Sequence, residues 1–430
     1  MVLESEFTPS WFQILALVLF ISALIHTFSC SWIHKIALAR PQGSFPRLIF
    51  TLLSEIELVF AFWALLLLSM IQISRGFQDT LHFIRALSFT EPFFVFVIMV
   101  IAATKPVLDF AKFVTHFLTK MIPFKSSAKM YFIILGVMPL LGSLITEPAC
   151  MTVCALLLSD HFLSKNVSTR FKYLSLGILF VNVSIGGTLT HYAAPPVLMV
   201  AHTWDWDTEF MFSHFGYKAM IACFLNAQLG SLVLKNELKS LTVNTSLKLH
   251  SPLIMILVHL MILTLTVFTL HEPVTFGLIF LCFLGWINFT KKFQTPLKLK
   301  KSILVAVFLA GVMIVGKPQD WWLTPIIAKL SPLLLNLSVT GLTAITDNAA
   351  LTYLGTLIPT LSPDHQIALM SGAVTGGGLT LIANAPNPAG AQISHSHFKD
   401  GIISPALLFV AALSPTLIAW ICLWGLPTIR

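Results

Sequence analysis

The stretch that decides the fold is SLITEPACMTVCALLL at residues 143–158, because TAITDNAALTYLGTLI at residues 343–358 repeats it. At an offset of 200 positions the two stretches share five identical residues, and Glu147 falls opposite Asp347. Each stretch therefore carries a carboxylate inside otherwise apolar sequence. Ionisable groups are costly inside a membrane, so such a position marks a functional site.

A second pair of stretches repeats at an offset of 190 positions: GGTLTHYAAPP from Gly186 and GGGLTLIANAP from Gly376. Glycine permits strained backbone angles and proline interrupts the helical hydrogen-bond ladder, so both stretches predict broken helices. Two repeats that combine an intramembrane carboxylate with a broken helix are typical of secondary transporters, whose site lies where the repeats meet.

Composition places the chain in a membrane. Hydrophobic residues make up 56% of the chain, charged residues 10%, and the mean hydropathy is +0.86. Soluble domains carry about 25% charged residues, and a membrane span needs about 20 apolar residues. We predict an all-α polytopic membrane protein with spans at 11–33, 48–74, 92–111, 171–200, 217–234, 252–270, 274–290, 302–316, 366–393 and 402–426.

The net charge of +8 is gathered in particular connections and is not a nucleic-acid footprint. Cytoplasmic loops of membrane proteins carry an excess of Lys and Arg. We therefore place the amino terminus outside, and in the cytoplasm the basic segments 34–47, 112–129, 165–172, 235–248 and 291–301. The external connections are those poor in Lys and Arg, 201–216, 271–273 and 359–366.

This topology predicts that the two repeats are inverted. Residues 131–158 lie between two basic loops, so they must enter the membrane and return, and Pro148 favours a bend just before it. Residues 333–358 lie between two external segments, so the second hairpin enters from the opposite face. We expect N-terminal scaffold spans in 1–91, transport repeat 1 in 92–234, a linker with scaffold spans in 235–301, and inverted transport repeat 2 in 302–430.

The hairpin tips and helix breaks supply the predicted binding site. Non-helical backbone at membrane depth leaves carbonyl and amide groups free to replace the hydration shell of an ion. An oxygen-rich site with carboxylates suits a hard cation such as sodium. A buried carboxylate binds a proton once the cation leaves, so competition between the two is sufficient for antiport. The candidate oxygen donors are Glu147 and Asp347, as sodium ligands, with Thr190, Thr380, Asn384 and Asn387.

Each candidate also has a structural interpretation. Asp347, followed by Asn348, could cap the start of a helix, because both residue types are favoured there. Glu147 could likewise be structural, and His191 in the first break could pack as well as shuttle protons. For four charged residues in or beside spans, the sequence leaves both a transport role and a structural role open: Glu55, Glu57, Lys105 and Asp109. We expect the lone span histidine, His259, to be hydrogen-bonded locally.

At these residues the chain resembles the ion-transporter superfamily, which includes sodium/proton antiporters, arsenite permeases and sodium-coupled dicarboxylate transporters. TDNAALTYLG, from Thr346, is similar to the Asp-Asn hairpin motif of the sodium/proton antiporter branch. Within that branch the chain resembles the bacterial family named "putative sodium/proton antiporters". The resemblance covers roughly 90–235 and 300–430. It implies inverted repeats, each with a re-entrant hairpin and a broken transmembrane helix, and a homodimer formed through scaffold helices.

The resemblance also implies binding roles at matching positions. The second hairpin tip corresponds to Thr346, Asp347 and Asn348, the first to Thr146 and Glu147, and the breaks run from Gly187 and from Gly377. The first tip departs from the pattern, because it has Glu-Pro where the motif has Asp-Asn, and this weakens a two-carboxylate sodium site. The Ser-Asn-Thr tip of the dicarboxylate branch is absent from both hairpins, which counts against that branch.

These observations predict a secondary active transporter of the inner (cytoplasmic) membrane that exchanges sodium, or another cation, for protons. The alternative on the same scaffold is an organic-anion or oxyanion permease, with anions bound by the amides of the breaks. A third hypothesis, a non-transporting membrane scaffold, does not explain why the motifs occur twice. The sequence has no P-loop and no nucleophile–base pair, so we expect no enzyme activity and no cofactor. The expected partners are the cation, the proton and the lipid bilayer.

Overall fold

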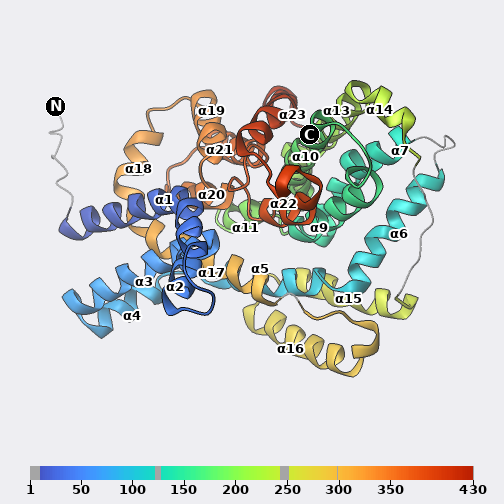
Figure 1. Ribbon diagram of the computed structural model, residues 1–430. Helices are drawn as coiled ribbons and strands as arrows, with labels where there is room; N and C mark the ends of the chain where they lie inside the picture. The colour runs from blue at the N-terminus through green and yellow to red at the C-terminus, as the bar shows by residue number, and fades with distance from the viewer. Residues whose placement is uncertain (1–9, 122–126, 243–250, 298, 430) are drawn as a thin grey trace.

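The computed structural model describes residues 10–121, 127–242, 251–297 and 299–429 (Figure 1). Parts of two basic loops that we predict to be cytoplasmic, 122–126 and 243–250, lie outside the described residues. Within these ranges the chain forms helices joined by turns and no strand. The all-α class predicted from composition is confirmed.

Six helical segments of the described chain are long and apolar enough to cross a membrane, and a pair of helices bent by 62° makes up to seven. The bent pair is α4 (Phe77–Arg85) with α5 (Thr90–Ala102). Shorter apolar helices accompany these segments, namely α2 (Phe45–Ser54), α15 (Leu253–Phe268), α16 (Pro273–Phe289) and α19 (Pro332–Thr343). The protein is therefore a polytopic membrane protein.

Two predicted spans are wrong in their extent. Span 48–74 is divided between α2 and α3 (Ile56–Arg75), because the backbone of Glu55 is extended, with ψ 111°. Span 92–111 is divided between α5 and α6 (Lys105–Met121). Thr104 closes α5 by donating to the Ile101 carbonyl at 2.7 Å. Hydropathy alone does not register either break, because the breaks cover only one and two residues within apolar runs.

The N-terminal and central helices pack into one group. α1 (Trp11–Leu38), α3 and α17 (Leu299–Gly316) contact one another, and α17 also contacts α5. α3 and α17 cross closely at Gly311, where an added Cβ would lie 2.5 Å from the backbone nitrogen of Ala61. α15 and α16 pack against α5 at the lower edge of Figure 1. These helices make the frame beside which the repeated motifs lie.

The first repeated region folds as a hairpin followed by a broken helix. The backbone bends at Thr146, which has φ +73°, and α9 starts at the next residue. The helix after the hairpin ends at Gly187–Leu189 and restarts at Pro195, so the predicted break is confirmed. The elements are α7 (Ser127–Phe132), η1 (Ile133–Val137), η2 (Met138–Leu141), α8 (Gly142–Ile145), α9 (Glu147–Leu158), η3 (Ser159–Leu163), α10 (Thr169–Gly186), η4 (Gly187–Leu189), α11 (Pro195–Ala201), α12 (Thr208–Met211), η5 (Phe212–Gly216), α13 (Tyr217–Val233) and α14 (Lys235–Ser240).

The second repeated region has the same order. α19 and α20 form the hairpin, and the helix after it is interrupted between Gly376 and Asn387, as predicted. Its first arm is shorter than that of the first hairpin, because α19 has 12 residues whereas residues 127–145 are helical and apolar throughout. The turn η6 (Lys291–Phe293) precedes this region in the linker. The elements of the region are η7 (Lys317–Gln319), α18 (Asp320–Ile327), α20 (Asn348–Thr356), α21 (Pro363–Gly376), α22 (Asn387–Ser394), η8 (His395–His397), η9 (Lys399–Gly401) and α23 (Pro405–Gly425).

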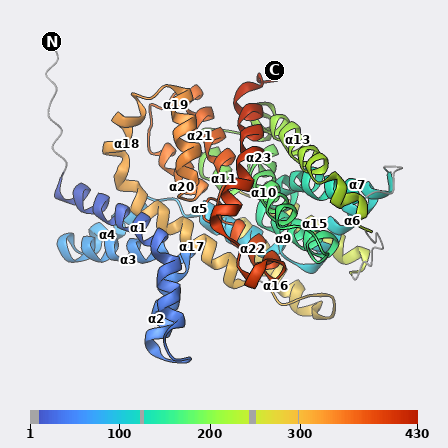
Figure 2. The ribbon, with the colours of Figure 1, turned by 45° about the horizontal axis from the view of Figure 1, so that its top comes forward.

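The two regions pack crosswise. α11, from the first broken helix, contacts α20 of the second hairpin, and α22, from the second broken helix, contacts α9 of the first hairpin. α10 and α21 also contact each other, and these helices lie together in both views (Figures 1 and 2). Both hairpin tips and both breaks are therefore held in one packed body.

Candidate functional site

The two hairpin tips make equivalent backbone contacts with the two helix breaks. The amide of Glu147 donates to the carbonyl of Ala193 at 3.2 Å, and the amide of Asn348 donates to the carbonyl of Ala383 at 3.0 Å. Buried backbone groups need such partners. Each half-helix of a hairpin therefore begins against the break of its own repeat.

The threonines of the breaks hold the other arm of each hairpin. The hydroxyl of Thr190 donates to the carbonyl of Ser143, and the hydroxyl of Thr380 donates to the carbonyl of Ala344, both at 2.8 Å. These two predicted ligands lie at the site, but their hydroxyl protons are used to fix the backbone.

These contacts shift the alignment of the tips by one residue. They make Glu147 equivalent to Asn348, an offset of 201, whereas the identical residues align at 200. The helices that follow the tips begin at the same offset of 201, α9 at Glu147 and α20 at Asn348. Asp347 is thus structurally equivalent to Thr146, and it is not the repeat counterpart of Glu147.

Glu147 is completely buried and reaches across the junction between the two repeats. Its Oε1 accepts a hydrogen bond from Asn384 Nδ2, which lies in the break of the other repeat, and its Oε2 has no partner. Gly187 lies beside this side chain, since a Cβ there would be in ordinary contact with the Glu147 Cβ at 3.7 Å. Asn384, which the sequence offered only as an oxygen donor, is therefore a partner of the first carboxylate.

Asp347 caps the second half-helix. Its Oδ1 accepts hydrogen bonds from the amides of Ala349 at 2.8 Å and Ala350 at 3.3 Å, and the amide of Ala385 also lies beside this carboxylate. The side chain is buried, and it is close enough to Glu147 for the two charges to interact. The structure therefore contains the cap considered from the sequence and brings the two carboxylates together.

Among the described residues, thirteen buried side-chain nitrogen and oxygen atoms have no hydrogen-bond partner, and six of them lie at the tips and breaks. These six are Thr146 Oγ1, Glu147 Oε2, both side-chain atoms of Asn348, Asn384 Oδ1 and Asn387 Oδ1. Such atoms are rare in native proteins and call for an ion or a water as partner. Thr146 also has the positive φ of the first tip, a conformation found mostly at functional sites.

The two carboxylates lack a basic partner among the described residues. No Lys or Arg is among the groups that act on either carboxylate. The described chain has no group of three or more His, Cys, Asp and Glu that could hold a metal ion. A cation bound between these carboxylates would therefore need neutral oxygens as its other ligands, and the amide and hydroxyl oxygens named above supply them.

Three other predicted residues have structural positions. Asn387 Nδ2 spans the second break by donating to the carbonyls of Gly377 at 2.7 Å and Thr380 at 2.8 Å. Gly377 is required by space, because an added Cβ would collide with Ser184 Oγ and approach Asn348. Thr346 lines an apolar cavity between α18, α19 and α20 and not the space beside Asp347.

The two histidines lie away from the carboxylates. The ring of His191 contacts Thr208 Oγ1 at 2.8 Å, in the connection predicted to be external. His259 contacts the carbonyl of Met255 at 2.7 Å, one turn earlier in α15, and this confirms its local hydrogen bond. Neither ring takes part in the predicted site.

Two serines that support the site were missed. Ser143 Oγ donates to the carbonyl of Gly186 at 2.8 Å and accepts from the amide of Leu189 at 2.9 Å. Ser184 Oγ donates to the carbonyl of Val374 at 2.8 Å and so joins α10 to α21. Nothing in a single sequence distinguishes these serines from others in apolar runs, because their partners are backbone groups.

A cavity at the predicted cytoplasmic end opens towards the carboxylates. This cytoplasmic vestibule, about 500 Å³, is lined by residues of α17 near Lys300 and by Glu55, Glu57, Thr152 and Gln392. A small inner cavity, about 30 Å³, is lined by Asp347, Asn384 and Phe308, among others. The two cavities share four lining residues, Glu57, Val305, Ala385 and Pro388. Asp347 is therefore approached from this vestibule.

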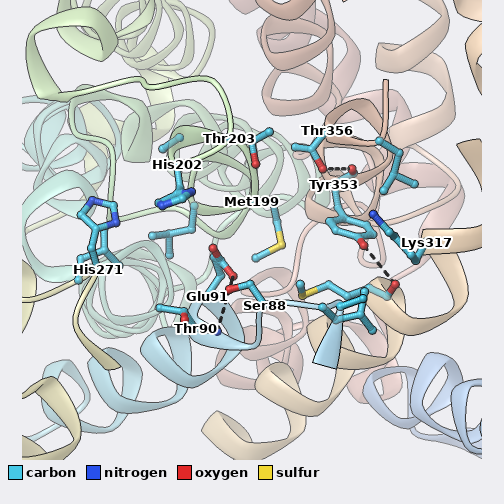
Figure 3. A pocket seen from close by; sticks show the side chains of 17 residues that line it. Ser88, Thr90, Glu91, Met199, His202, Thr203, His271, Lys317, Tyr353 and Thr356 are labelled. Atoms are coloured by element: carbon cyan, nitrogen blue, oxygen red, sulfur yellow. Dashed lines mark hydrogen bonds between the residues drawn. The ribbon is translucent and has the colours of Figure 1, made fainter. Parts of the chain in front are cut away.

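A second large cavity, about 320 Å³, lies at the other end of α17. Figure 3 shows its polar lining, which includes Glu91, Lys317, Tyr353, His202 and His271. The rings of these two histidines have centroids 5.2 Å apart. This cavity, at the end predicted to be external, shares no lining residue with the inner cavity among those described.

The comparison with protein families covers almost the whole chain. A model of the family described as "Putative Na+/H+ antiporter" matches residues 11–426. The chain belongs to this family. The match includes both hairpins, both breaks and the frame helices, so it confirms the resemblance seen at the motifs.

Membership of the antiporter family gives the class of protein. The family is one of membrane transporters and not of enzymes, and its description names sodium and the proton as the exchanged ions. Together with the apolar helices, it makes this chain a multi-pass membrane protein. No curated protein matches the chain.

Proposed function

We propose that this protein exchanges sodium for protons across a cytoplasmic membrane, with Glu147 and Asp347 binding the cation and the proton in competition. The observation that carries the proposal is the group of buried oxygens without partners around two carboxylates that have no basic neighbour. A buried carboxylate needs either a cation or a proton. Alternate occupancy by the two at one site couples their opposite movements without another energy source.

We propose further that the site is formed by two inverted repeats, 92–234 and 302–430, each of which supplies one tip and one break. The equivalent tip-to-break hydrogen bonds of Glu147 and Asn348 support this division. The direct bond between Glu147 and Asn384 would then make the site depend on both repeats. The homodimer implied by the family resemblance stays a prediction.

The use of the tip amides favours cation exchange over the anion permease. An anion site at a helix start would need free backbone amides. Here the amides of Ala349 and Ala350 donate to Asp347, and those of Glu147 and Asn348 donate to carbonyls of the breaks. These backbone amides are therefore occupied. Of the six unpartnered side-chain atoms at the tips and breaks, five are oxygens and one is a donor, Asn348 Nδ2.

Proteoliposomes loaded with a pH-sensitive dye test the proposal. A sodium jump should drive proton movement in the native protein, and Asp347→Asn should abolish it, because the amide keeps the shape of the side chain and loses its charge. The half-saturating sodium concentration should fall as the pH rises, since fewer protons then compete. Sodium-independent proton movement, or full exchange by Asp347→Asn, contradicts the proposal.

A further inference from the structure

Glu57 is the carboxylate that the frame presents to the inner cavity. It lies in the first turn of α3, and it lines both the cytoplasmic vestibule and the inner cavity, whereas Glu55 lines only the vestibule. Among the carboxylates of the described residues, Glu57 and Asp347 are the two that line the inner cavity. Glu57 thus stands between the open vestibule and the tip carboxylate.

The inner cavity has a second feature that points to a ligand. Asn384 lines it, is 1% exposed, and its Oδ1 has no hydrogen-bond partner. Its Nδ2 is already used by Glu147, so the amide is oriented and its oxygen is the free end. A carbonyl oxygen in a cavity that two carboxylates also line can ligate a cation but cannot bind an anion.

The position of Glu57 is fixed by backbone packing. Gly311 of α17 lies against the backbone of Phe60 and Ala61, one turn after Glu57 in α3, and leaves no space for α3 to shift. Val305 and Phe308 of α17 line the inner cavity beside Glu57. The frame therefore holds Glu57 at a constant place, whichever way the tips themselves are arranged.

Basic residues near Glu57 lie on the vestibule side. Glu57 interacts electrostatically with Lys300 and Lys301 of α17 and with Glu55. Lys301 Nζ donates to Gln392 Oε1 of α22 at 2.7 Å, so this lysine bridges the frame and the second broken helix. No basic residue lines the inner cavity within the described chain. A cation that passes the lysines meets Glu57 before it meets Asp347.

We propose that Glu57 is a cation-binding residue at the inner end of the vestibule, which takes a partly hydrated monovalent cation and delivers it to Asp347 and Asn384. This inference rests on the proposed cation exchange and adds a step on one face of the membrane. Glu57 is not a third ligand of the tip site, since the described carboxylates do not form a group of three. Its effect is therefore confined to cations that arrive through the vestibule.

The test is sided transport by Glu57→Gln in membrane vesicles of both orientations, with sodium added to one face at a time. In a water-filled vestibule, where the effective dielectric constant is about 40, a unit charge about 6 Å from the ion changes its binding by about tenfold. We expect the half-saturating sodium concentration to rise about tenfold on the vestibule face and to stay within about twofold on the other face. The rate at saturating sodium should be kept, which also shows that the variant folds.

Two further variants complete the experiment. Glu55→Gln, the matched control, removes a carboxylate from the vestibule but not from the inner cavity, and should leave both faces unchanged. Glu57→Asp should restore most of the vestibule-face affinity. An unchanged affinity in Glu57→Gln, or an equal change on both faces, overturns the inference while leaving the proposed function intact. Loss of the proposed function would instead appear as sodium-driven exchange that survives Asp347→Asn.

Discussion

At the second hairpin tip, Asp347 precedes the helix and accepts hydrogen bonds from two amides of its own first turn. At the first tip, Glu147 is already the first helical residue, and its side chain accepts a hydrogen bond from Asn384 of the other repeat. The backbone contacts of the tips are the same, but the acidic residue has moved by one position. The two repeated regions thus share the same backbone contacts at their tips. Their carboxylates differ, because Asp347 bonds within its own hairpin whereas Glu147 bonds across the repeats.

The largest effect that tests this difference is expected in Glu147→Gln. The glutamine keeps the size of the side chain but removes the charge, so exchange should fall at least about 100-fold. Because a buried charge with an unsatisfied oxygen is destabilising, the same variant should unfold at a higher temperature than the native protein. Vesicle transport and thermal unfolding in detergent measure the two effects. A variant that loses stability together with transport would make Glu147 a structural residue.

The two helix breaks offer the next comparison. A Cβ at Gly377 would collide with Ser184 Oγ, whereas one at Gly187 would lie 3.0 Å from the Ala194 Cβ, a milder approach. Gly377→Ala should therefore cost about 2 kcal/mol of stability, and Gly187→Ala clearly less. Chemical or thermal unfolding of the two matched variants measures the difference. Equal losses would mean that the breaks relax alike despite their different neighbours.

Asn384 provides a more moderate test of the bond across the repeats. Asn384→Ala removes the donor to Glu147 and the oxygen that lines the inner cavity, so the half-saturating sodium concentration should rise about tenfold. In the Glu147→Gln background the same change should add little, because the two residues act together. Because exchange in the Glu147→Gln background is too low to titrate, the sodium-dependent rise in unfolding temperature of the single and double variants gives the coupling. Independent, additive effects would separate Asn384 from Glu147.

The smallest effect separates the cap at Asp347 from its role in binding. Asp347→Ala should lose about 1 kcal/mol of stability because the helix loses its cap, and Asp347→Ser should recover most of it. Neither variant should exchange ions, since both lack the charge. Unfolding and transport measured on the same samples distinguish the two roles. Exchange restored by serine would reduce Asp347 to a cap.

The motifs predicted the parts of the site that depend on local backbone conformation. The breaks at Gly187 and Gly377 and the bend at Thr146 are present, because Gly and Pro act on the backbone locally. The one-residue shift between Glu147 and Asp347 could not be read from the sequence, since identical residues align better at the wrong offset and the true register is set by backbone hydrogen bonds.

The frame was predicted less well than the repeats. Span 48–74 contains a break at Glu55 that no glycine or proline marks, and this break is what begins α3 near Glu57. The role proposed for Glu57 in cation binding depends on the two cavities that it lines. These cavities arise from the packing of α3, α17 and α22. Residues whose importance comes from neighbours distant in the chain carry no signal in their own surroundings.

The crosswise contacts of α11 with α20 and of α22 with α9 constrain how ions can change sides. A movement that separated the two repeats would break both contacts and the hydrogen bond from Ser184 to Val374. It would also expose closely packed surfaces. We therefore expect the hairpins and broken helices of the two repeats to move as one block against the frame helices, which include α3 and the first helix of each repeat, α5 and α17. In this arrangement the frame stays in place, and the position of the moving block decides to which side of the membrane the site opens.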